Sequence, residues 1–127
     1  MFYKTINMVK LNYFLKKKYV KLILNKNDMK IIKIFMQLNI ISMVKKNWKH
    51  KNLYTIYFKY LKGEPVFGNI NNLYKPSKPV SINLKELYKI NKKKTHIFIM
   101  STNKGLITNF NAEQKKLGGL LIFSIQI

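Results

Sequence analysis

The chain has 127 residues, of which 47% are hydrophobic, so it can bury a core and is not a disordered tail. Its 25 basic residues against 4 acidic ones give a formal net charge of +21, which points to a polyanionic partner. The absence of cysteine excludes disulfides and thiolate metal sites, and no apolar run has the length of a membrane span.

Every one of the 25 basic residues is a lysine, and a lysine ammonium is a point charge that suits phosphates better than base edges. The abundant residue types Lys, Asn, Ile, Phe, Tyr and Met have AT-rich codons, whereas alanine occurs only at position 112. This bias is typical of organellar or reduced endosymbiont genomes, so mutation accounts for part of the lysine excess. It does not account for the scarcity of acids, whose codons can also be AT-rich.

The N-terminal part predicts helices alternating with strands. Apolar positions at helical spacing among lysines predict a helix over residues 4–17, and a β-like run follows at 19–24. Asn27 or Asp28 is expected to cap a second helix, because a short side-chain oxygen accepts from free backbone amides. The residues expected to be buried by this helix are Ile31, Ile32, Phe35 and Met36.

A predicted hairpin follows, with strands over 40–45 and 53–61 joined by a polar connection. One side of the second strand is expected to be core. The two sides are formed by Tyr54, Ile56, Phe58 and Tyr60 and by Thr55, Tyr57 and Lys59. Gly63-Glu64-Pro65 is the expected boundary between two lobes. We therefore predict an N-terminal α-β-α-β-β lobe over residues 1–63 and a C-terminal lobe over residues 64–127.

The C-terminal lobe is predicted to be mostly antiparallel β structure with short helices, so the chain as a whole is α+β. A run at 81–84 precedes a helical turn at 85–90, and a strand covers 96–100. Asn109 is expected to cap a short helix that ends at Gly118-Gly119, where positive φ is expected. The final strand, 120–127, is expected to place on one face Leu121, Phe123, Ile125 and Ile127.

Catalytic machinery is hard to assemble from these residues. The acids are scattered through separate segments, at Asp28, Glu64, Glu86 and Glu113. His50 and His96 have no neighbouring acid or cysteine that would complete a metal site or a catalytic triad. We therefore expect no enzyme, no cofactor, no metal ion and no small-molecule substrate.

Features suited to nucleic-acid binding are easier to find. Lysines cluster at 16–18, at 45–51 and at 92–94, although each cluster alone is equally well explained as a solvated face. Trp48 lies in a lysine-rich turn, where it either stacks on an unpaired base or packs back on its own hairpin. Packing on the hairpin is the more common arrangement for such a ring.

A polar cluster lies between two apolar runs in HIFIMSTNKGLITNF, residues 96–110. Hydroxyl and amide groups of Ser101, Thr102 and Asn103 can reach ribose hydroxyls and base edges in a shallow groove. Lys104 can hold a phosphate, and Gly105 lets backbone come close. The alternative is that the two hydroxyls only cap a turn, and composition favours neither reading.

Residues 97–127, IFIMSTNKGLITNFNAEQKKLGGLLIFSIQI, resemble the C-terminal end of the small-subunit ribosomal protein S-eight family. The family pattern is a strand, a Ser-Thr-x-Lys-Gly loop, a Thr-Asp/Asn helix start and a Gly-Gly pair before the last strand. It is matched without a gap by Ser101, Thr102, Lys104, Gly105, Thr108, Asn109, Gly118 and Gly119. Upstream, residues 60–79 resemble the family's central segment through Ser77-Lys78-Pro79, and the predicted N-terminal lobe has the family's order of elements.

The resemblance implies a structural constituent of the ribosome that acts in translation. It implies direct binding to the central domain of small-subunit rRNA, support of its assembly, and contact with neighbouring small-subunit proteins. In the family, the Ser-Thr loop and the Gly-Gly region contact a distorted stem through its minor groove, and basic residues of the N-terminal lobe hold nearby backbone. The RNA-binding residues implied here are Ser101, Thr102, Asn103, Lys104, Gly105, Gly118, Gly119, Lys78, Lys30 and Lys10.

The chain also departs from the family pattern. Val80 stands where glycine commonly follows Ser-Lys-Pro, and Leu120 stands where an acid usually follows Gly-Gly. Asn103 replaces a second serine. These departures weaken the expectation of contacts from residues 80–84 and around residue 120, and leave the expected fold unchanged.

The AT bias leads us to expect a mitochondrial small subunit, with a plastid or the cytoplasm of an AT-rich bacterium as alternatives. For a protein encoded inside the organelle, no cleavable leader is expected before the first helix. The alternative function is a basic peripheral protein that binds anionic membrane through its N-terminal helix. Binding to an rRNA stem and to anionic vesicles distinguishes the two hypotheses.

Overall fold

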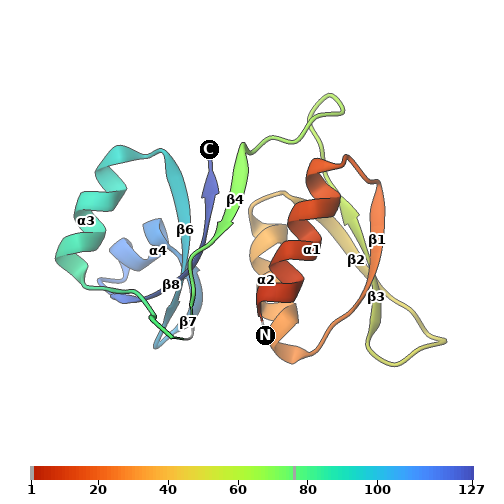
Figure 1. The fold of residues 1–127 in the computed structure, drawn as a ribbon, viewed down its shortest axis with the longest axis horizontal. Helices are drawn as coiled ribbons and strands as arrows, with labels where there is room; N and C mark the ends of the chain where they lie inside the picture. The colour runs from red at the N-terminus through yellow and green to blue at the C-terminus, as the bar shows by residue number, and fades with distance from the viewer. Residues whose placement is uncertain (1, 76) are drawn as a thin grey trace. The chain divides into compact units, whose positions relative to one another are not determined.

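The protein is α+β, as predicted, and divides into two compact units. The computed structural model describes residues 2–75 and 77–127. Met1–Val66 form the first unit and Phe67–Ile127 the second. Each unit contains its own antiparallel sheet and its own helices (Figure 1).

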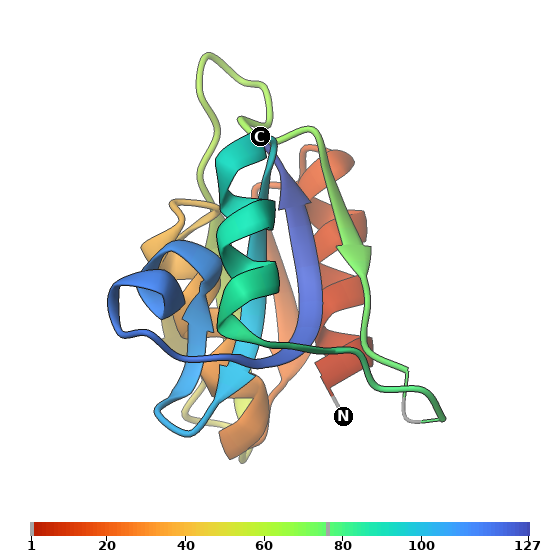
Figure 2. The same cartoon turned by 90° about the vertical axis from the view of Figure 1, so that its left-hand side faces the viewer.

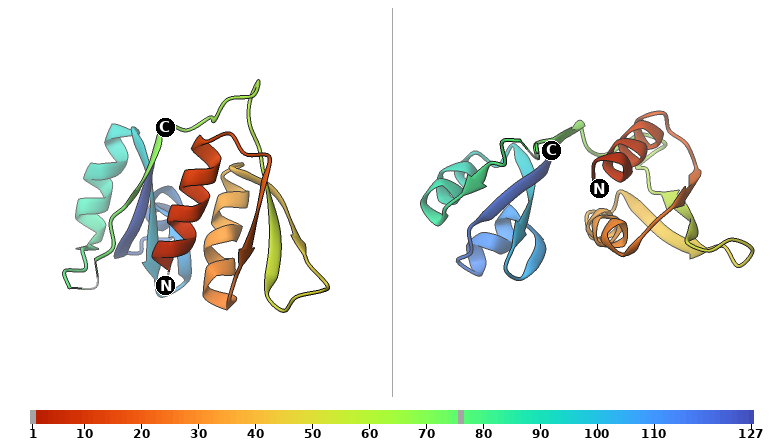
Figure 3. Two further views of the ribbon diagram at one scale, coloured as in Figure 1. Left: turned by 45° about the vertical axis from the view of Figure 1, so that its right-hand side comes forward. Right: turned by 60° about the horizontal axis from the view of Figure 1, so that its bottom comes forward.

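The first unit is a three-stranded antiparallel sheet with helices on one face. Its elements are α1 (Phe2–Phe14), β1 (Tyr19–Ile23), α2 (Lys26–Gln37), β2 (Ile41–Lys46) and β3 (Leu53–Phe58). Strand β3 lies in the centre, between β1 and β2. In Figure 3, α1 and α2 lie side by side against one face of this sheet. The predicted α-β-α-β-β order is confirmed.

The core of the first unit is formed where α1 packs on the central strand. Ile6, Val9 and Tyr13 of α1 are at most 1% exposed. Phe58 of β3 is also buried, with its ring centroid 6.0 Å from that of Tyr13. Tyr60 lies just beyond the strand and stacks on Tyr13 with ring planes 10° apart. The side of α1 that carries Ile6, Val9 and Tyr13 is therefore used inside the unit, whereas Leu11 is 55% exposed.

Helix α2 begins earlier than the sequence predicts. Its N-cap is Asn25, and the predictions of Asn27 and Asp28 are wrong. The Asn25 side chain accepts from the backbone amide of Asp28 at 2.8 Å, and the Asp28 carboxylate accepts from the Asn25 amide at 3.3 Å. This reciprocal capping box gives the backbone amides of both Asn25 and Asp28 a hydrogen-bond acceptor. A helix that started at Asn27 or Asp28 would lose this pair of bonds.

The buried face of α2 also differs in part from the prediction. Ile31, Ile32 and Phe35 are buried as predicted, but Met36 is 39% exposed. Ile34, at 5% exposed, is buried instead. Helical spacing alone allows a small rotation of the apolar stripe, and packing against the sheet decides which edge of it is covered.

Residues 64–66 are held to the first unit. Leu61 and Glu64 exchange two backbone hydrogen bonds of 3.0 Å, which close a turn. The Glu64 carboxylate accepts from the Lys16 ammonium at 2.7 Å, and the amide of Val66 donates to the Tyr13 hydroxyl at 2.9 Å. These contacts bind the segment to α1 and set the end of the first unit at Val66.

The second unit is a twisted antiparallel sheet with helices on one face. Its elements are β4 (Asn69–Asn72), β5 (Ser81–Ile82), α3 (Leu84–Lys93), β6 (His96–Thr102), β7 (Gly105–Thr108), α4 (Asn109–Gln114) and β8 (Gly119–Gln126). The strand order is β4-β8-β6-β7, and β5 pairs with the beginning of β8. Figure 2 shows α3 in front of this sheet. Strand β7 is a new element, and α3 is longer than the predicted turn.

A cluster of apolar side chains joins the helices of the second unit to its sheet. Its buried members are Ile82, Leu87, Met100, Ala112 and Leu121. These residues come from β5, α3, β6, α4 and β8, so every layer of the unit contributes to one core.

A β-bulge changes the faces of the last strand. The predicted single face was Leu121, Phe123, Ile125 and Ile127. Ile99 pairs with Phe123 but the next residue, Met100, pairs with Leu121, so Ile122 is an extra residue in β8. Successive residues of β6 point to opposite faces, and cross-strand partners share a face, so Leu121 and Phe123 point to opposite faces. The prediction of a single face is therefore wrong.

Candidate nucleic-acid interface

The β6–β7 hairpin carries the Ser-Thr loop. Thr102 pairs with Gly105, so Asn103 and Lys104 form a tight turn with exposed side chains. Gly105 has a φ of +99°, which residues with a Cβ rarely adopt. The hairpin therefore needs glycine at this position for its own geometry.

The two hydroxyls of the loop have different roles. The hydroxyl of Thr102 donates to the carbonyl oxygen of Gly105 at 3.0 Å and accepts from the amide of Lys104 at 3.2 Å. Thr102 therefore caps the turn, which is one of the two alternatives that the sequence left open. The half-buried Ser101 hydroxyl has no hydrogen-bond partner among the described residues. Ser101 is thus the hydroxyl that remains for a ligand.

The Gly-Gly pair allows neighbouring strands to approach closely. A Cβ at Gly118 would lie 2.6 Å from the carbonyl oxygen of Ile82 in β5. A Cβ at Gly119 would overlap the carbonyl oxygen of Ser101 in β6. The backbone at the beginning of β8 is therefore held tightly between β5 and β6, directly beside the Ser-Thr loop.

The expectation of positive φ at Gly118-Gly119 is wrong. Helix α4 ends at Gln114, and the left-handed residue is Lys116, with a φ of 57°. The turn that reverses the chain comes soon after the helix, so the glycines serve strand packing instead.

A buried amide network supports the base of the hairpin. Asn109 is 1% exposed, and its side-chain oxygen accepts from the amide of Phe98 at 3.1 Å. Its side-chain NH₂ donates to the Asn91 side-chain oxygen at 2.6 Å. Asn91 in turn donates to the carboxylate of Glu113 at 2.9 Å. The network ties α3, α4 and β6 together.

The N-cap of α4 is Thr108, so the prediction of Asn109 is wrong. The Thr108 hydroxyl accepts from the amide of Asn111 at 3.3 Å. Thr108 and Asn109 both have side chains that can cap a helix. The Asn109 side-chain amide instead bonds Phe98 and Asn91.

The structure brings part of the predicted site together. Ser101 pairs with Leu120, so the loop at 101–105 and the glycines at 118–119 lie in adjoining strands. Lys78 is exposed and precedes β5, which pairs with the same end of β8. Lys10 is half-buried in α1 and Lys30 is exposed on α2, so both belong to the first unit.

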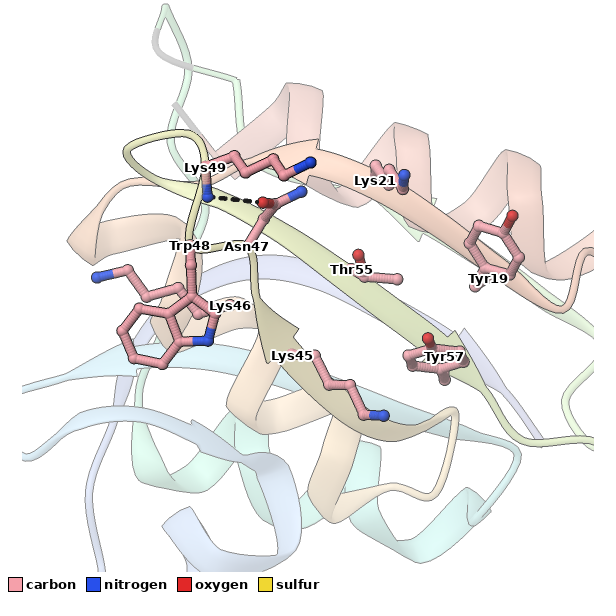
Figure 4. A pocket seen from close by; sticks show the side chains of 9 residues that line it. All are labelled: Tyr19, Lys21, Lys45, Lys46, Asn47, Trp48, Lys49, Thr55 and Tyr57. Carbon is pink, nitrogen blue, oxygen red and sulfur yellow. Dashed lines mark hydrogen bonds between the residues drawn. The ribbon is translucent and has the colours of Figure 1, made fainter.

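A second basic surface lies on the face of the N-terminal sheet opposite α1 and α2 (Figure 4). We call it the open sheet face. A shallow hollow of about 570 Å³ on it is lined by Tyr19, Lys21, Lys45, Lys46, Asn47, Trp48, Lys49, Thr55 and Tyr57. The lysine cluster at 45–51 pointed to one edge of this surface. The alternation of side chains along β1 and β3 is the signal that would have completed it.

Trp48 is 92% exposed, so it does not pack back on its own hairpin. Of the two arrangements considered from the sequence, the common one is therefore wrong for this ring. The backbone amide of Lys49 donates to the Asn47 side chain at 2.9 Å, which stabilises the turn that presents the ring.

The membrane alternative places its anchor in α1. Ile6, Val9 and Tyr13 of this helix are buried in the chain's own fold, whereas Leu11 is 55% exposed. No helix in the described part of the chain has the length and apolar character needed to cross a membrane.

A tight hairpin of small polar side chains, closely packed backbone and abundant lysines are features of a protein that binds a polyanion. The family model of ribosomal protein S8 matches residues 4–126, so the chain belongs to that family of structural, non-enzymatic proteins. The resemblance drawn from the Ser-Thr loop and the Gly-Gly pair is confirmed.

Several relatives of this chain are named as small ribosomal subunit proteins. Small ribosomal subunit protein uS8c of Euglena longa is 40% identical over 67 residues, which cover 50% of this chain and 46% of that protein. Small ribosomal subunit protein uS8 of Baumannia cicadellinicola is 35% identical over 88 residues, covering 62% and 59%. Small ribosomal subunit protein uS8 of Desulfovibrio desulfuricans is 32% identical over 71 residues, covering 56% of each. The chain spans about half the length of these relatives.

Proposed function

We propose that this protein is a structural constituent of the small ribosomal subunit in translation. It binds the central domain of small-subunit rRNA directly and supports its assembly beside neighbouring ribosomal proteins. The observation that carries this proposal is the free Ser101 hydroxyl in a tight hairpin next to the closely packed Gly119. Family membership and the names of the relatives support the same function.

The C-terminal hairpin suits the wide, shallow minor groove of an RNA stem. Side chains no larger than Ser101 and Asn103 let the backbone approach sugar edges, where 2′-hydroxyls and base edges are displayed. Lys104 is exposed at the tip of the turn and contacts a phosphate. The glycines at 118–119 keep β8 close to the loop, so no bulky side chain separates the hairpin from the groove.

The net charge of +21 supplies the sequence-independent part of the affinity. Each phosphate neutralised releases counterions, so affinity falls with salt by roughly 0.7–0.9 log units per log unit of salt for each contact. In this proposal Lys78, Lys30 and Lys10 contribute to that term, whereas the hairpin tip supplies the preference for one stem.

A binding experiment with a matched pair of variants tests the proposal. The probes are a stem from the central domain of small-subunit rRNA and a random duplex of the same length, compared at several salt concentrations. Ser101→Ala should lower the affinity for the stem about 10-fold, because one specific contact is lost, and leave the affinity for the random duplex unchanged. Ser42→Ala, which removes an exposed hydroxyl from the first unit, is the control and should leave both affinities unchanged.

Equal affinity of the wild-type chain for stem and random duplex, even at low salt, would contradict the proposal. Anionic vesicles serve as a third probe. Tight vesicle binding without any preference among RNAs would instead support the peripheral membrane protein.

We further propose an organellar ribosome, and specifically a mitochondrial one. The AT-rich residue usage supports an organellar genome. Co-sedimentation of the protein with mitochondrial small subunits after a high-salt wash is the expected result. Recovery only with plastid or bacterial subunits would overturn the mitochondrial assignment and leave the ribosomal proposal intact.

A further inference from the structure

Side chains on the open sheet face are arranged in regular rows. The proposed binding of an RNA stem by the C-terminal hairpin does not involve them. The strand register across β1, β3 and β2 defines one row of Tyr19, Tyr57 and Met43. The next row along the strands is Lys21, Thr55 and Lys45. A row that contains two rings therefore lies beside a row with a lysine at each end (Figure 4).

Tyr19 and Trp48 on this face are accessible to a ligand, and Tyr57 is half-buried. Tyr19 is 50% exposed and Trp48 is 92% exposed. The centroids of Tyr19 and Tyr57 are 5.8 Å apart with ring planes at 45°, so the two rings do not stack face to face on each other. Ring surface therefore remains for a flat partner to stack on.

The charge on this face has a single sign. The residues that line the hollow include Lys21, Lys45, Lys46 and Lys49 and no acid. The Lys45 ammonium lies over the Tyr57 ring, 5.6 Å from its centroid, in a cation–π contact. A base can stack on that ring when the exposed Lys45 side chain turns from the ring to a phosphate. Unpaired bases and phosphates also alternate along a single-stranded nucleic acid.

We propose that the open sheet face is a second nucleic-acid site, which takes an unpaired, single-stranded RNA segment. The choice of RNA over other polyanions rests on the proposed ribosomal function. Bases stack on Tyr19, Tyr57 and Trp48, because every base offers a flat face and stacking tolerates any sequence. Lys21 and Lys45 hold the flanking phosphates. A duplex does not fit, since its base faces are already covered by their neighbours.

The same side chains argue against a lipid surface. The polar Thr55 occupies the centre of the face between two lysines, which interrupts the apolar area that an acyl chain would need. An acidic peptide would neutralise the lysines but would leave the exposed rings without partners. A single strand uses both the rings and the charges.

Trp48 provides a direct signal for this site, because it is the one tryptophan in the sequence. The probe is an oligoadenylate of about eight nucleotides, within the usual span of such sites. We expect it to quench Trp48 fluorescence in the 127-residue chain. An equal concentration of a short RNA duplex should quench it much less.

Two pairs of variants separate stacking from charge. Tyr19→Leu combined with Tyr57→Leu keeps apolar bulk and should weaken oligoadenylate binding about 10-fold, while leaving the affinity for the rRNA stem unchanged. Lys21→Gln with Lys45→Gln should reduce the slope of log affinity against log salt by about 1.4, or about 0.7 for each lysine. The charge-matched control, Lys85→Gln with Lys92→Gln on α3, should leave both the quenching and its salt slope unchanged.

The lysine variants alter exposed side chains, so they remain informative even if the tyrosine variant fails to fold. Oligoadenylate binding that is equally weakened by the α3 lysine pair would overturn the inference, because the attraction would then be general charge alone. Quenching by vesicles of phosphatidylcholine and phosphatidylserine, without quenching by oligoadenylate, would also overturn it. Quenching by oligoadenylate in a chain without stem preference would support the sheet site and refute the proposed stem recognition.

Discussion

The two units present different kinds of surface. In the second unit, the candidate stem-binding residues are also the residues that hold the sheet together, since Thr102 caps the hairpin and Gly119 packs on the backbone of Ser101. In the first unit, the helices and core lie on one side of the sheet, and the lysines and rings of the open sheet face lie on the other.

This difference predicts different responses to mutation. Where binding and packing share atoms, a substitution damages stability and recognition together. Where they occupy opposite faces of a sheet, stability can change while the binding surface stays intact. The substitutions below test that contrast, beginning with the largest expected effect.

Gly119→Ala should lower the free energy of unfolding by about 3 kcal/mol and abolish stem preference, because the new Cβ forces β8 away from β6. Gly68→Ala is the control, since its Cβ would meet only the Gln126 side chain at an ordinary 3.5 Å. It should change the free energy of unfolding by less than about 0.5 kcal/mol. Urea unfolding followed by circular dichroism measures both, and equal midpoints would contradict the close packing of β8.

Asn109→Ala should lower the free energy of unfolding by about 2 kcal/mol, because it leaves the Phe98 amide and the side-chain oxygen of the buried Asn91 without their partner. It should also weaken stem binding, since the base of the hairpin loosens. Asn111→Ala, on an exposed position of the same helix, should cost less than about 0.5 kcal/mol. Similar unfolding midpoints for the two variants would show that the network adds nothing.

Asn25→Ala should cost about 1 kcal/mol by removing the capping box of α2. Asn27→Ala should be neutral or slightly stabilising, because Asn27 lies inside the helix, where alanine has the higher propensity. Both variants should keep the Trp48 signal with oligoadenylate. A larger loss of stability from Asn27→Ala than from Asn25→Ala would identify Asn27 as the N-cap, as the sequence predicts.

The pH dependence of Tyr60 tests a single titrating group of the first unit. Desolvation by burial, with a contribution from Tyr13, raises the pKa of Tyr60 from 10.0 to about 12. Below pH 10 the phenol is protonated in both folded and unfolded chains, so its contribution to stability is complete. Between pH 10 and about 12 the unfolded phenol ionises first, and the contribution is lost.

Tyr60→Phe lacks this ionisation, so its free energy of unfolding should increase relative to that of the wild type as pH rises from about 10 to 12. Both chains share every other titrating group, which makes the difference specific. Urea unfolding at a series of pH values measures it. A constant difference across that range would contradict the raised pKa.

Much of the architecture was predictable from local pattern. Alternation and helical spacing predicted the element order of the first unit, and the Ser-Thr and Gly-Gly motifs placed the second unit in its family before any geometry was known. The boundaries of elements were less predictable. Asn25, Asn27 and Asp28 are all competent caps, and the choice among them depended on a reciprocal hydrogen bond that the sequence does not display.

For the candidate stem site, the sequence proposes a set of residues, and the structure adds their arrangement. The family motif pointed to Ser101 and Thr102 equally, and only the hairpin geometry shows that Thr102 is occupied by the turn while the Ser101 hydroxyl is not. The glycines at 118–119 were expected to bend the chain, and instead they let strands approach each other.

The sequence by itself determined the charge, the periodicity of each segment and the family, because these are carried by composition, local spacing and short motifs. Tertiary structure decided which segments became partners. The bulge at Ile122 placed Leu121 and Phe123 on opposite faces of β8. The pairing of β1 with β3 placed Tyr19 beside Tyr57. Strand register depends on contacts between residues far apart in the chain, and a shift of one residue moves side chains to the opposite face. No local pattern contains that information.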